Sequence, residues 1–369
     1  MGRVIMQAFY WDCESNWYRK VKEKLPELYY AGITDIWLPP PSRGLNQGGM
    51  GYDIYDHYNL NTRFGTKREL KDLIRTAHRY GIRVIADVVM GHAIGGKKEY
   101  NPYLETETYT KFNQPEFPKN YKHFCHNCVG CHTDNSYGEK ICYYSDNGYM
   151  KDNLIKWCRW LKDSIGFDGF RLDNCKQIRW DFIRDWKEAL QTFTIGEYWD
   201  GDRGLLQRWR DYTNCNVFNF PLFYSLKEMC NNPALFDMRC LMDNVFEGSV
   251  SFVENHDTDR FDPVIFNKIL AYAFNILFTD YTCIFWKDYY IYNLKREIDS
   301  LLEIRNRTVD RVEIEYADYD LLVARRGNYR IFINKGETTR IYNGMRIDGA
   351  NYKIAYNTRA EHYLEESMT

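Results

Sequence analysis

The stretch TKRELKDLIRTAHRYGIRVIADVV (66–89) decides the fold, because it contains one complete passage from a helix into a strand. The first half predicts a helix whose apolar positions share one face: Leu70, Leu73, Ile74 and Ala77. The second half, IRVIADVV (82–89), is a short apolar run with the composition of a buried strand. A helix followed at once by a buried strand is typical of β/α units.

The same alternation continues on both sides of this stretch. Further candidate strands are residues 4–11, 33–40, 167–174, 192–199, 216–222, 248–256 and 282–286. About eight strands with helices between them are the inventory of a (β/α)8 TIM barrel. A doubly wound sheet has the same local rhythm, and periodicity alone does not separate the two folds.

Two stretches break the alternation. Residues 91–150 are irregular, rich in Tyr, Asn, Gly and Cys, and too long for an ordinary loop, so they predict a subdomain inserted after the third strand. From residue 311 the chain changes to short alternating segments separated by turn residues, which predicts a small all-β domain. The predicted organisation is a barrel of residues 1–90 and 151–310, an inserted subdomain of residues 91–150 and a C-terminal domain of residues 311–369.

Composition narrows the class of ligand and the location. The chain has 369 residues and a net charge of −2, which disfavours a nucleic-acid or membrane partner and favours a neutral or small ligand. No apolar run approaches the roughly 20 residues of a membrane helix, and the first residues do not resemble a secretion signal. Eleven cysteines, an odd number, suit a reducing compartment. We expect a cytoplasmic protein.

Polar side chains recur where the candidate strands end. They are Asp87, His92, Arg171, Asp173, Glu197, His256 and Asp257. Any one of them could be a loop cap, but in a barrel the carboxyl ends of the strands surround the face where active sites lie. Their recurrence at several strand ends therefore predicts an active site.

Two of the carboxylates have contrasting neighbours. Arg171 and Asp173 point the same way on a strand, and a guanidinium keeps an adjacent carboxylate ionised, as a nucleophile requires. Glu197 lies between Ile195 and the aromatic pair 198–199, and apolar surroundings favour a protonated carboxyl group. A nucleophile and a general acid about 5 Å apart are the pair that a retaining glycosidase uses.

Four motifs carry a family resemblance: DVVMGH (87–92), GFRLDNCK (169–176), GEYW (196–199) and FVENHD (252–257). In this order they resemble the signature regions of the α-amylase family, glycoside hydrolase family thirteen, and archaeal α-amylases in particular. The similarity runs from about residue 4 to 290.

This resemblance implies a role for each matching residue. Asp173 corresponds to the nucleophile, Glu197 to the general acid/base and Asp257 to a third carboxylate that binds sugar hydroxyls. The substrate-binding positions are Tyr52, His92, Arg171, Lys176 and His256, with Asp87 as structural support. The usual histidine after Lys176 is replaced by Gln177, which affects the leaving-group side.

The predicted function is therefore a retaining, endo-acting α-1,4-glucan hydrolase that cleaves starch, glycogen or maltooligosaccharides through a covalent glycosyl-enzyme. Two alternatives stay open: a 4-α-glucanotransferase on the same fold, and a catalytically silent glycan-binding protein. An α-glucan or maltooligosaccharide is the expected partner in each case.

The inserted stretch HFCHNCVGCHTDNSYGEKIC (123–142) is rich in metal-binding side chains. Its cysteines are Cys125, Cys128, Cys131 and Cys142, and His123, His126 and His132 are alternative ligands. Thiolates at this density favour structural zinc. Disulfides, free thiols or an iron–sulfur cluster are the alternatives.

Calcium is less expected than zinc. The family resemblance implies a Ca²⁺ between the barrel and the inserted subdomain, with an asparagine ligand where this chain has Gly91. Glycine has no side-chain oxygen, so the usual site is weakened. Asp134, Glu139 and Asp146 could compensate, but Lys140 lies among them. We expect zinc to stabilise the subdomain instead.

Overall fold

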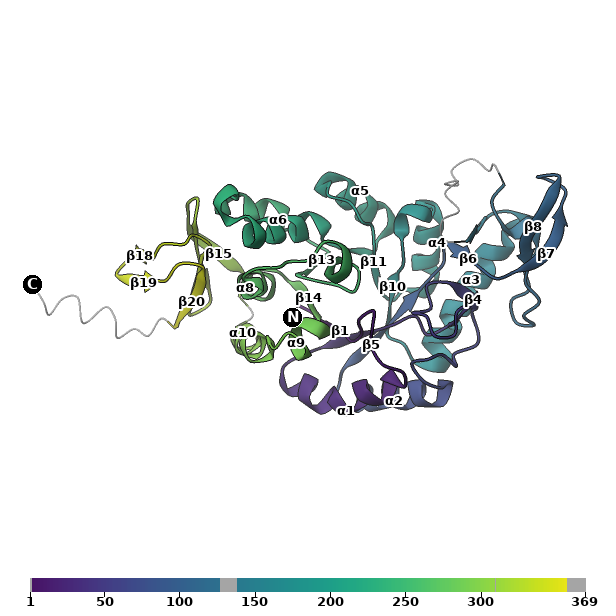
Figure 1. Cartoon of the computed structure of the whole chain (residues 1–369), viewed down its shortest axis with the longest axis horizontal. Helices are drawn as coiled ribbons and strands as arrows, with labels where there is room; N and C mark the ends of the chain where they lie inside the picture. Colours follow the sequence, from purple (N-terminus) through teal and green to yellow (C-terminus); the bar gives the residue numbers. More distant parts are fainter. Residues whose placement is uncertain (1, 127–137, 309, 357–369) are drawn as a thin grey trace, which may run out of the picture. The chain divides into compact units, whose positions relative to one another are not determined.

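A closed barrel forms the core of the fold (Figure 1). The computed structural model describes residues 2–126, 138–308 and 310–356. Within them eight strands close the barrel in the order β1-β14-β13-β12-β11-β10-β5-β2. The strands are β1 (Val4–Gln7), β2 (Asp35–Leu38), β5 (Arg83–Val88), β10 (Gly169–Leu172), β11 (Phe193–Gly196), β12 (Asn216–Phe218), β13 (Ser249–Phe252) and β14 (Tyr281–Phe285). The predicted (β/α)8 barrel is confirmed, and the doubly wound sheet is excluded.

Helices follow the strands along the chain. They are α1 (Trp17–Tyr30), α2 (Lys67–Arg79), α3 (Tyr149–Trp160), α4 (Trp180–Leu190), α5 (Arg203–Thr213), α6 (Phe220–Asn231), α7 (Thr258–Phe261), α8 (Lys268–Phe278), α9 (Trp286–Tyr290) and α10 (Lys295–Arg307). Shorter or wider turns are η1 (Tyr121–His123), η2 (Asp146–Gly148), η3 (Leu161–Ile165), η4 (Cys175–Gln177), η5 (Pro233–Leu235) and η6 (Met238–Asn244).

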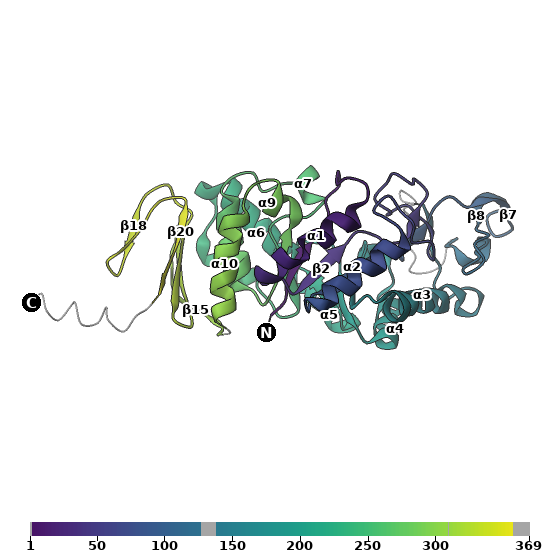
Figure 2. The ribbon, with the colours of Figure 1, turned by 90° about the horizontal axis from the view of Figure 1, so that it is seen from below.

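Helix α2 shows how the sequence produces these elements. Thr66 and Glu69 form a capping box that satisfies amide groups at the helix start. The predicted apolar stripe, Leu70, Leu73, Ile74 and Ala77, is fully buried. Helices α1 and α2 lie side by side in Figure 2, and Lys22 Nζ meets Asp72 Oδ2 at 2.8 Å between them.

The register of the barrel strands places polar residues at the carboxyl ends of neighbouring strands. Arg171 of β10 lies opposite Asp87 of β5 on one side and Ile195 of β11 on the other. Asp173 and Glu197 follow these strands directly, and the amide of Glu197 donates to the carbonyl of Leu172 at 2.9 Å. Because the strands are parallel, their carboxyl ends deliver these side chains together.

The chain divides into two compact units. One is Ile5–Phe218, and the other consists of residues 1–4 and 219–369. The predicted domain boundaries at residues 90, 150 and 310 stay a prediction.

The first unit contains the irregular subdomain after the third barrel strand, β5. Here β6 (His92–Ala93) pairs with β9 (Glu139–Lys140), and β7 (Lys97–Asn101) forms a hairpin with β8 (Thr106–Lys111). A further short pair, β3 (Arg43–Gly44) and β4 (Ile54–Asp56), precedes α2. The insertion predicted in the fold class is confirmed.

The second unit contains the predicted small β domain. An antiparallel sheet has the order β15-β16-β17-β20, and β18 pairs with β19. The strands are β15 (Val312–Ala317), β16 (Leu321–Arg326), β17 (Tyr329–Asn334), β18 (Arg340–Tyr342), β19 (Met345–Ile347) and β20 (Asn351–Tyr356). Leu321, Val323, Phe332 and Ile347 form its buried core.

The prediction of a strand over residues 216–222 was too long. Strand β12 ends at Phe218 and α6 begins at Phe220. The reason is local, because Asn219 Oδ1 accepts from the amide of Leu222 at 3.0 Å and Pro221 lies in the first helical turn.

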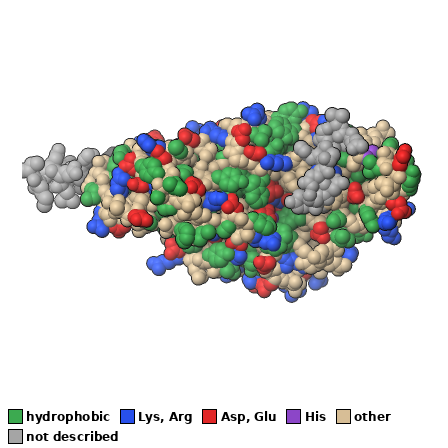
Figure 3. All heavy atoms as spheres, turned by 45° about the horizontal axis from the view of Figure 1, so that its top comes forward, with side chains coloured by type: hydrophobic (Ala, Val, Ile, Leu, Met, Phe, Trp, Pro, Cys, Tyr) green, Lys and Arg blue, Asp and Glu red, His purple; other side chains and the backbone are tan. Residues whose placement is uncertain are grey.

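The surface agrees with the balanced composition. Acidic and basic side chains are interspersed over the face shown in Figure 3, in keeping with the net charge of −2. Among the helices of the described residues, none combines the length and the apolar character that crossing a bilayer would require.

Candidate active site

Arg171 lies at the centre of the site in the first unit. One terminal nitrogen, Nη1, is 2.8 Å from Asp87 Oδ1 and 2.8 Å from Asp173 Oδ1. The other, Nη2, is 2.6 Å from Glu197 Oε1. Burial opposes the charge of this side chain, which is 1% exposed, but the surrounding carboxylates outweigh burial and raise the pKa of Arg171 above its ordinary value. The guanidinium therefore holds both predicted catalytic carboxylates.

Asp87 supports the guanidinium from within the barrel. Its Oδ2 accepts from the hydroxyl of Tyr52 at 2.9 Å and from Nε1 of Trp37 at 3.2 Å. Burial raises the pKa of Asp87 to about 6, against the opposing effect of Arg171. Asp87 has no exposed surface, so it orients Arg171 and does not meet a ligand directly.

Asp173 and Glu197 are the more accessible carboxylates of this cluster. Their side chains are 14% and 9% exposed, against 0% for Asp87. The turn after β10 places Asn174 in the left-handed region, with φ at 43°, and its amide donates to Glu197 Oε2 at 2.9 Å. Glu197 is therefore held by ionic and amide contacts, which the sequence, with its apolar residues on either side of Glu197, did not predict.

Tyr52 and His92 lie beside the carboxylates. The Tyr52 ring stacks on Trp11, with ring centres 6.1 Å apart, while its hydroxyl contacts Asp87. His92 Nε2 is 2.8 Å from the carbonyl oxygen of Tyr52. Burial lowers the pKa of His92, so its imidazole is neutral near pH 7. Their substrate-binding role stays a prediction.

Lys176 stands apart from the carboxylate cluster. It lies in η4, its side chain is 45% exposed, and its Nζ is 2.9 Å from Asp200 Oδ2. The next residue, Gln177, has a buried Oε1 with no hydrogen-bond partner among the described residues. Sequence reasoning missed Asp200, because it belongs to no motif and lies 24 residues from Lys176.

His256 and Asp257 lie in the second unit, directly after β13. His256 Nε2 is 3.3 Å from Asp257 Oδ2, and His256 is 2% exposed. The side chain of Asn255 accepts from the amides of Asp257 and Thr258 at 2.8 and 2.9 Å, which fixes the turn. The structure thus joins Tyr52, Asp87, His92, Arg171, Asp173 and Glu197 in one cluster, and His256 with Asp257 in another.

Part of the predicted zinc site lies outside the described residues, namely Cys128, Cys131 and His132. Phe124 and Ile141 form an antiparallel bridge, beside which the amide of Cys125 donates to the carbonyl of Lys140 at 2.8 Å and that of Cys142 to the carbonyl of His123 at 2.9 Å. Within residues 2–126, 138–308 and 310–356, no group of three or more metal-binding side chains occurs.

The two described histidines of this stretch differ in their contacts. His123 accepts from the amide of Asn120 at 3.0 Å through Nδ1 and meets Asp146 at 3.2 Å through Nε2. His126 stacks on Tyr103, and its Nδ1 is buried with no partner in the described part of the chain. His126 therefore fits a metal-ligand role better than His123.

The described residues do not fit the calcium site that the resemblance implied. Gly91 supplies no side-chain oxygen, and Lys140 is buried opposite His92 in the β6–β9 pair. Asp146 is engaged by His123, and burial raises the pKa of Glu139. Among the described residues, a hard cation that needs six to eight oxygen ligands finds no such set, and Asp134 lies outside them.

Comparisons with known proteins agree with this architecture. The family model "Alpha amylase, catalytic domain" matches residues 18–293. An α-amylase of Geobacillus stearothermophilus is 28% identical over 87% of this chain and 73% of the relative. An α-amylase of Bacillus licheniformis is 27% identical over 98% of this chain and 89% of that relative.

Solved structures show the same fold. An α-amylase from Malbranchea cinnamomea aligns with a TM-score of 0.73 at 20% identity, covering 96% of this chain and 94% of the other. The cyclomaltodextrin glucanotransferase CldA aligns with a TM-score of 0.72 at 17% identity, covering 97% and 99%. None of these relatives bears on the predicted likeness to archaeal enzymes.

Proposed function

Because this chain belongs to the α-amylase family, and is thus a glycoside hydrolase, we propose that it is a retaining, endo-acting α-1,4-glucan hydrolase. The observation that carries the proposal is the attachment of Asp173 and Glu197 to opposite terminal nitrogens of one buried guanidinium. Two accessible carboxyl groups held side by side are what double displacement at an anomeric carbon requires.

In the first step Asp173 attacks the anomeric carbon while Glu197 donates a proton to the leaving glycosidic oxygen. The bond to the leaving sugar breaks, and a covalent glycosyl-enzyme forms on Asp173. In the second step a water molecule gives its proton to Glu197 and its oxygen to the anomeric carbon, which releases Asp173. Starch, glycogen or maltooligosaccharides are the substrates.

Arg171 supplies the electrostatic link between these steps. Asp173 Oδ1 lies 2.8 Å from this guanidinium, and an adjacent cation favours the ionised carboxylate that attacks. When Asp173 becomes an ester its negative charge disappears, so Glu197 loses a like-charged neighbour and holds its proton less tightly. This change suits the return of Glu197 as a general base in the second step.

The remaining residues bind the sugar in this proposal. Asp257, directly after β13, is the third carboxylate and binds sugar hydroxyls with its neighbour His256. His92 binds a sugar hydroxyl as well. Tyr52 is the aromatic platform, and Lys176, paired with Asp200, contacts the sugar on the leaving-group side.

A 4-α-glucanotransferase is the second candidate, since the fold also matches the cyclomaltodextrin glucanotransferase CldA. The catalytically silent binder is less supported, because Asp173, Glu197 and Arg171 form an intact constellation.

Product lengths from maltoheptaose distinguish hydrolysis from transfer. We expect products that are all shorter than the substrate, because water is the acceptor, and chromatography of a time course measures them. The Glu197→Gln variant gives the baseline. Early products longer than seven glucose units would favour the transferase and contradict the hydrolase.

We also propose that zinc stabilises the inserted subdomain, through Cys125, Cys128, Cys131 and Cys142 or with His126 as one ligand. Zinc, when bound, would add folding free energy to this part of the chain. Elemental analysis of protein purified without chelator should give about one equivalent of zinc. Calcium near one equivalent without zinc would contradict this proposal.

Two further proposals concern the cellular location of the protein and its likeness to archaeal α-amylases. Buried free thiols at Cys13, Cys158, Cys175, Cys215 and Cys230 support a reducing, cytoplasmic location. The proposed likeness to archaeal α-amylases is a separate matter, which a phylogeny of the family would test.

A further inference from the structure

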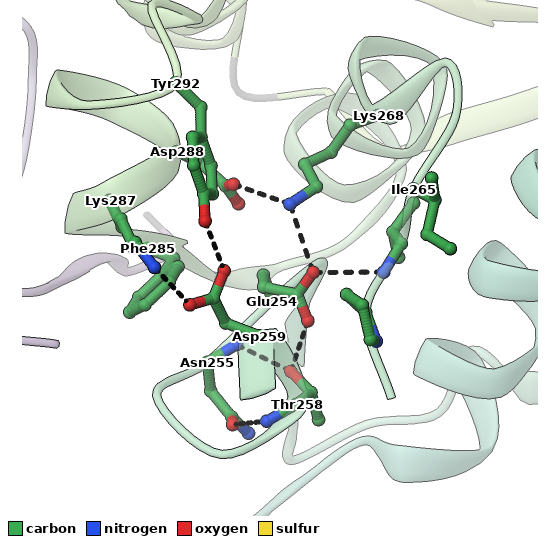
Figure 4. Close-up of polar contacts among 12 residues, drawn as sticks. Glu254, Asn255, Thr258, Asp259, Ile265, Lys268, Phe285, Lys287, Asp288 and Tyr292 are labelled. Carbon is green, nitrogen blue, oxygen red and sulfur yellow. Dashed lines mark hydrogen bonds and ion pairs between the residues drawn. The ribbon is translucent and has the colours of Figure 1, made fainter. Parts of the chain in front are cut away.

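A buried cluster of charges lies under the turn that follows β13 (Figure 4). Lys268, the first residue of α8, contacts Glu254 Oε2 at 3.1 Å and Asp288 Oδ1 at 2.8 Å. Both carboxylates are completely buried, and the lysine side chain is 12% exposed. The cluster thus joins the end of β13, the start of α8 and the short helix α9.

Glu254 connects this cluster to the turn. Its Oε1 accepts from the hydroxyl of Thr258, and its Oε2 accepts from the amide of Val264 at 3.0 Å. The hydroxyl of Thr258 in turn accepts from the amide of Asn255 at 2.9 Å. Glu254 therefore holds both ends of the segment 255–264, which carries His256 and Asp257.

A second set of contacts strengthens the same segment. Asp259 meets Lys287 at 2.7 Å and accepts from the hydroxyl of Tyr292 at 3.0 Å, while the hydroxyl of Tyr272 donates to Asp288 at 2.7 Å (Figure 4 shows Lys287, Asp288 and Tyr292). Because Lys287 and Asp288 are neighbours on α9, the helix anchors the turn at two points.

Such a cluster is costly for folding. Removing ions from water costs several kcal/mol for each ion, and hydrophobic side chains of the same volume often give equal or greater stability. Burial raises the pKa of Glu254 to about 7, although Lys268 opposes this. Stability alone therefore gives little reason for three charged groups at this place, whereas precise positioning of the turn does.

We propose that Lys268 is a positioning residue: its ammonium joins Glu254 and Asp288 and thereby fixes the turn that presents His256 and Asp257. The inference deepens the proposed function, on which it rests, because it assigns the geometry of the third carboxylate to a lysine outside the signature motifs. Lys268 itself does not meet the substrate.

The test compares Lys268→Met with Lys335→Met. Methionine keeps the apolar length of lysine and removes the charge. Lys335 is a matched control from the same unit, since its side chain is 1% exposed and contacts Asp320 at 2.7 Å and the carbonyl of Pro233 at 2.8 Å. Kinetics on maltoheptaose and amide hydrogen exchange are measured for both variants, well below their melting temperatures.

Lys268→Met should lower kcat by about 10- to 100-fold, because a displacement of a site residue by about 1 Å can lower the rate by about 10²-fold. KM should change by less than about threefold. Exchange should rise in a peptide covering residues 253–265 and stay unchanged in residues 321–334. Lys335→Met should keep kcat within about twofold of the wild type and raise exchange in residues 321–334 instead.

The outcomes separate the two proposals. Unchanged exchange in residues 253–265, or raised exchange with an unchanged kcat, would overturn the positioning role. A wild-type protein that cleaves no glucan, while Lys268→Met still loosens residues 253–265, would overturn the proposed function and leave the link between Lys268 and the turn standing. If Lys268→Met does not fold, Asp288→Asn is compared with Lys335→Met instead. The expected loss of kcat is then smaller.

Discussion

Replacing Arg171 by Met should lower kcat on starch by at least about 100-fold, because the carboxylates of Asp87, Asp173 and Glu197 lose the cation that holds them. Leaving buried carboxylates without their partner should also destabilise the fold by about 3–5 kcal/mol. Initial rates and denaturant unfolding measure the two effects separately.

The destabilisation should depend on pH in a defined direction. The pKa of Asp87 is about 6 in the folded protein and 3.8 ordinarily, so the folded state binds its proton more tightly. The stability that this group contributes is therefore present at low pH and lost as the pH rises from about 4 to 6. Without Arg171 the pKa of Asp87 rises further, and the loss extends above pH 6. Arg171→Met should accordingly lose more stability at pH 8 than at pH 5.

Arg83→Met is the matched control. Arg83 begins β5 and binds both oxygens of the buried Asp35 at 2.9 and 2.8 Å, at the opposite ends of the strands from Asp173. It should lose stability while keeping kcat within about threefold, since residues at that face serve stability. Equal losses of kcat in both variants would mean that Arg171 acts only through the fold.

The sequence was sufficient for features that depend on local pattern. The apolar stripe of α2 lies within eight consecutive residues, and periodicity identified it correctly. The strand predicted over residues 216–222 was too long at its end, because a cap at Asn219 starts a helix and overrides the β propensity of the residues that follow. Periodicity carries no information on such a cap.

The sequence could not predict the contacts of the site that join residues far apart in the chain. The pairing of Arg171 with Asp173 follows from two positions on one strand, whereas its contact with Asp87 spans 84 residues and depends on barrel register. The same holds for Lys268, which is separated from Glu254 by 14 residues and from Asp288 by 20. A motif indicates which residues are chemically competent, but only the closed barrel decides which cation serves which carboxylate.

The central claim is that Asp173 is the nucleophile of a glucan hydrolase, and reducing-sugar release from soluble starch tests it most directly. Asp173→Asn keeps the shape and an oxygen that can accept from Arg171, but it cannot form the glycosyl ester. We expect steady release by the wild type and a loss of about 10⁴- to 10⁶-fold in the variant, the range seen when a catalytic unit loses a member.

Asp211→Asn is the control, because Asp211 is an exposed carboxylate on α5 whose charge serves no proposed step. It should release sugar at the wild-type rate. Release by Asp173→Asn within about tenfold of the wild type would contradict the account, since no loss that small is compatible with removal of the nucleophile.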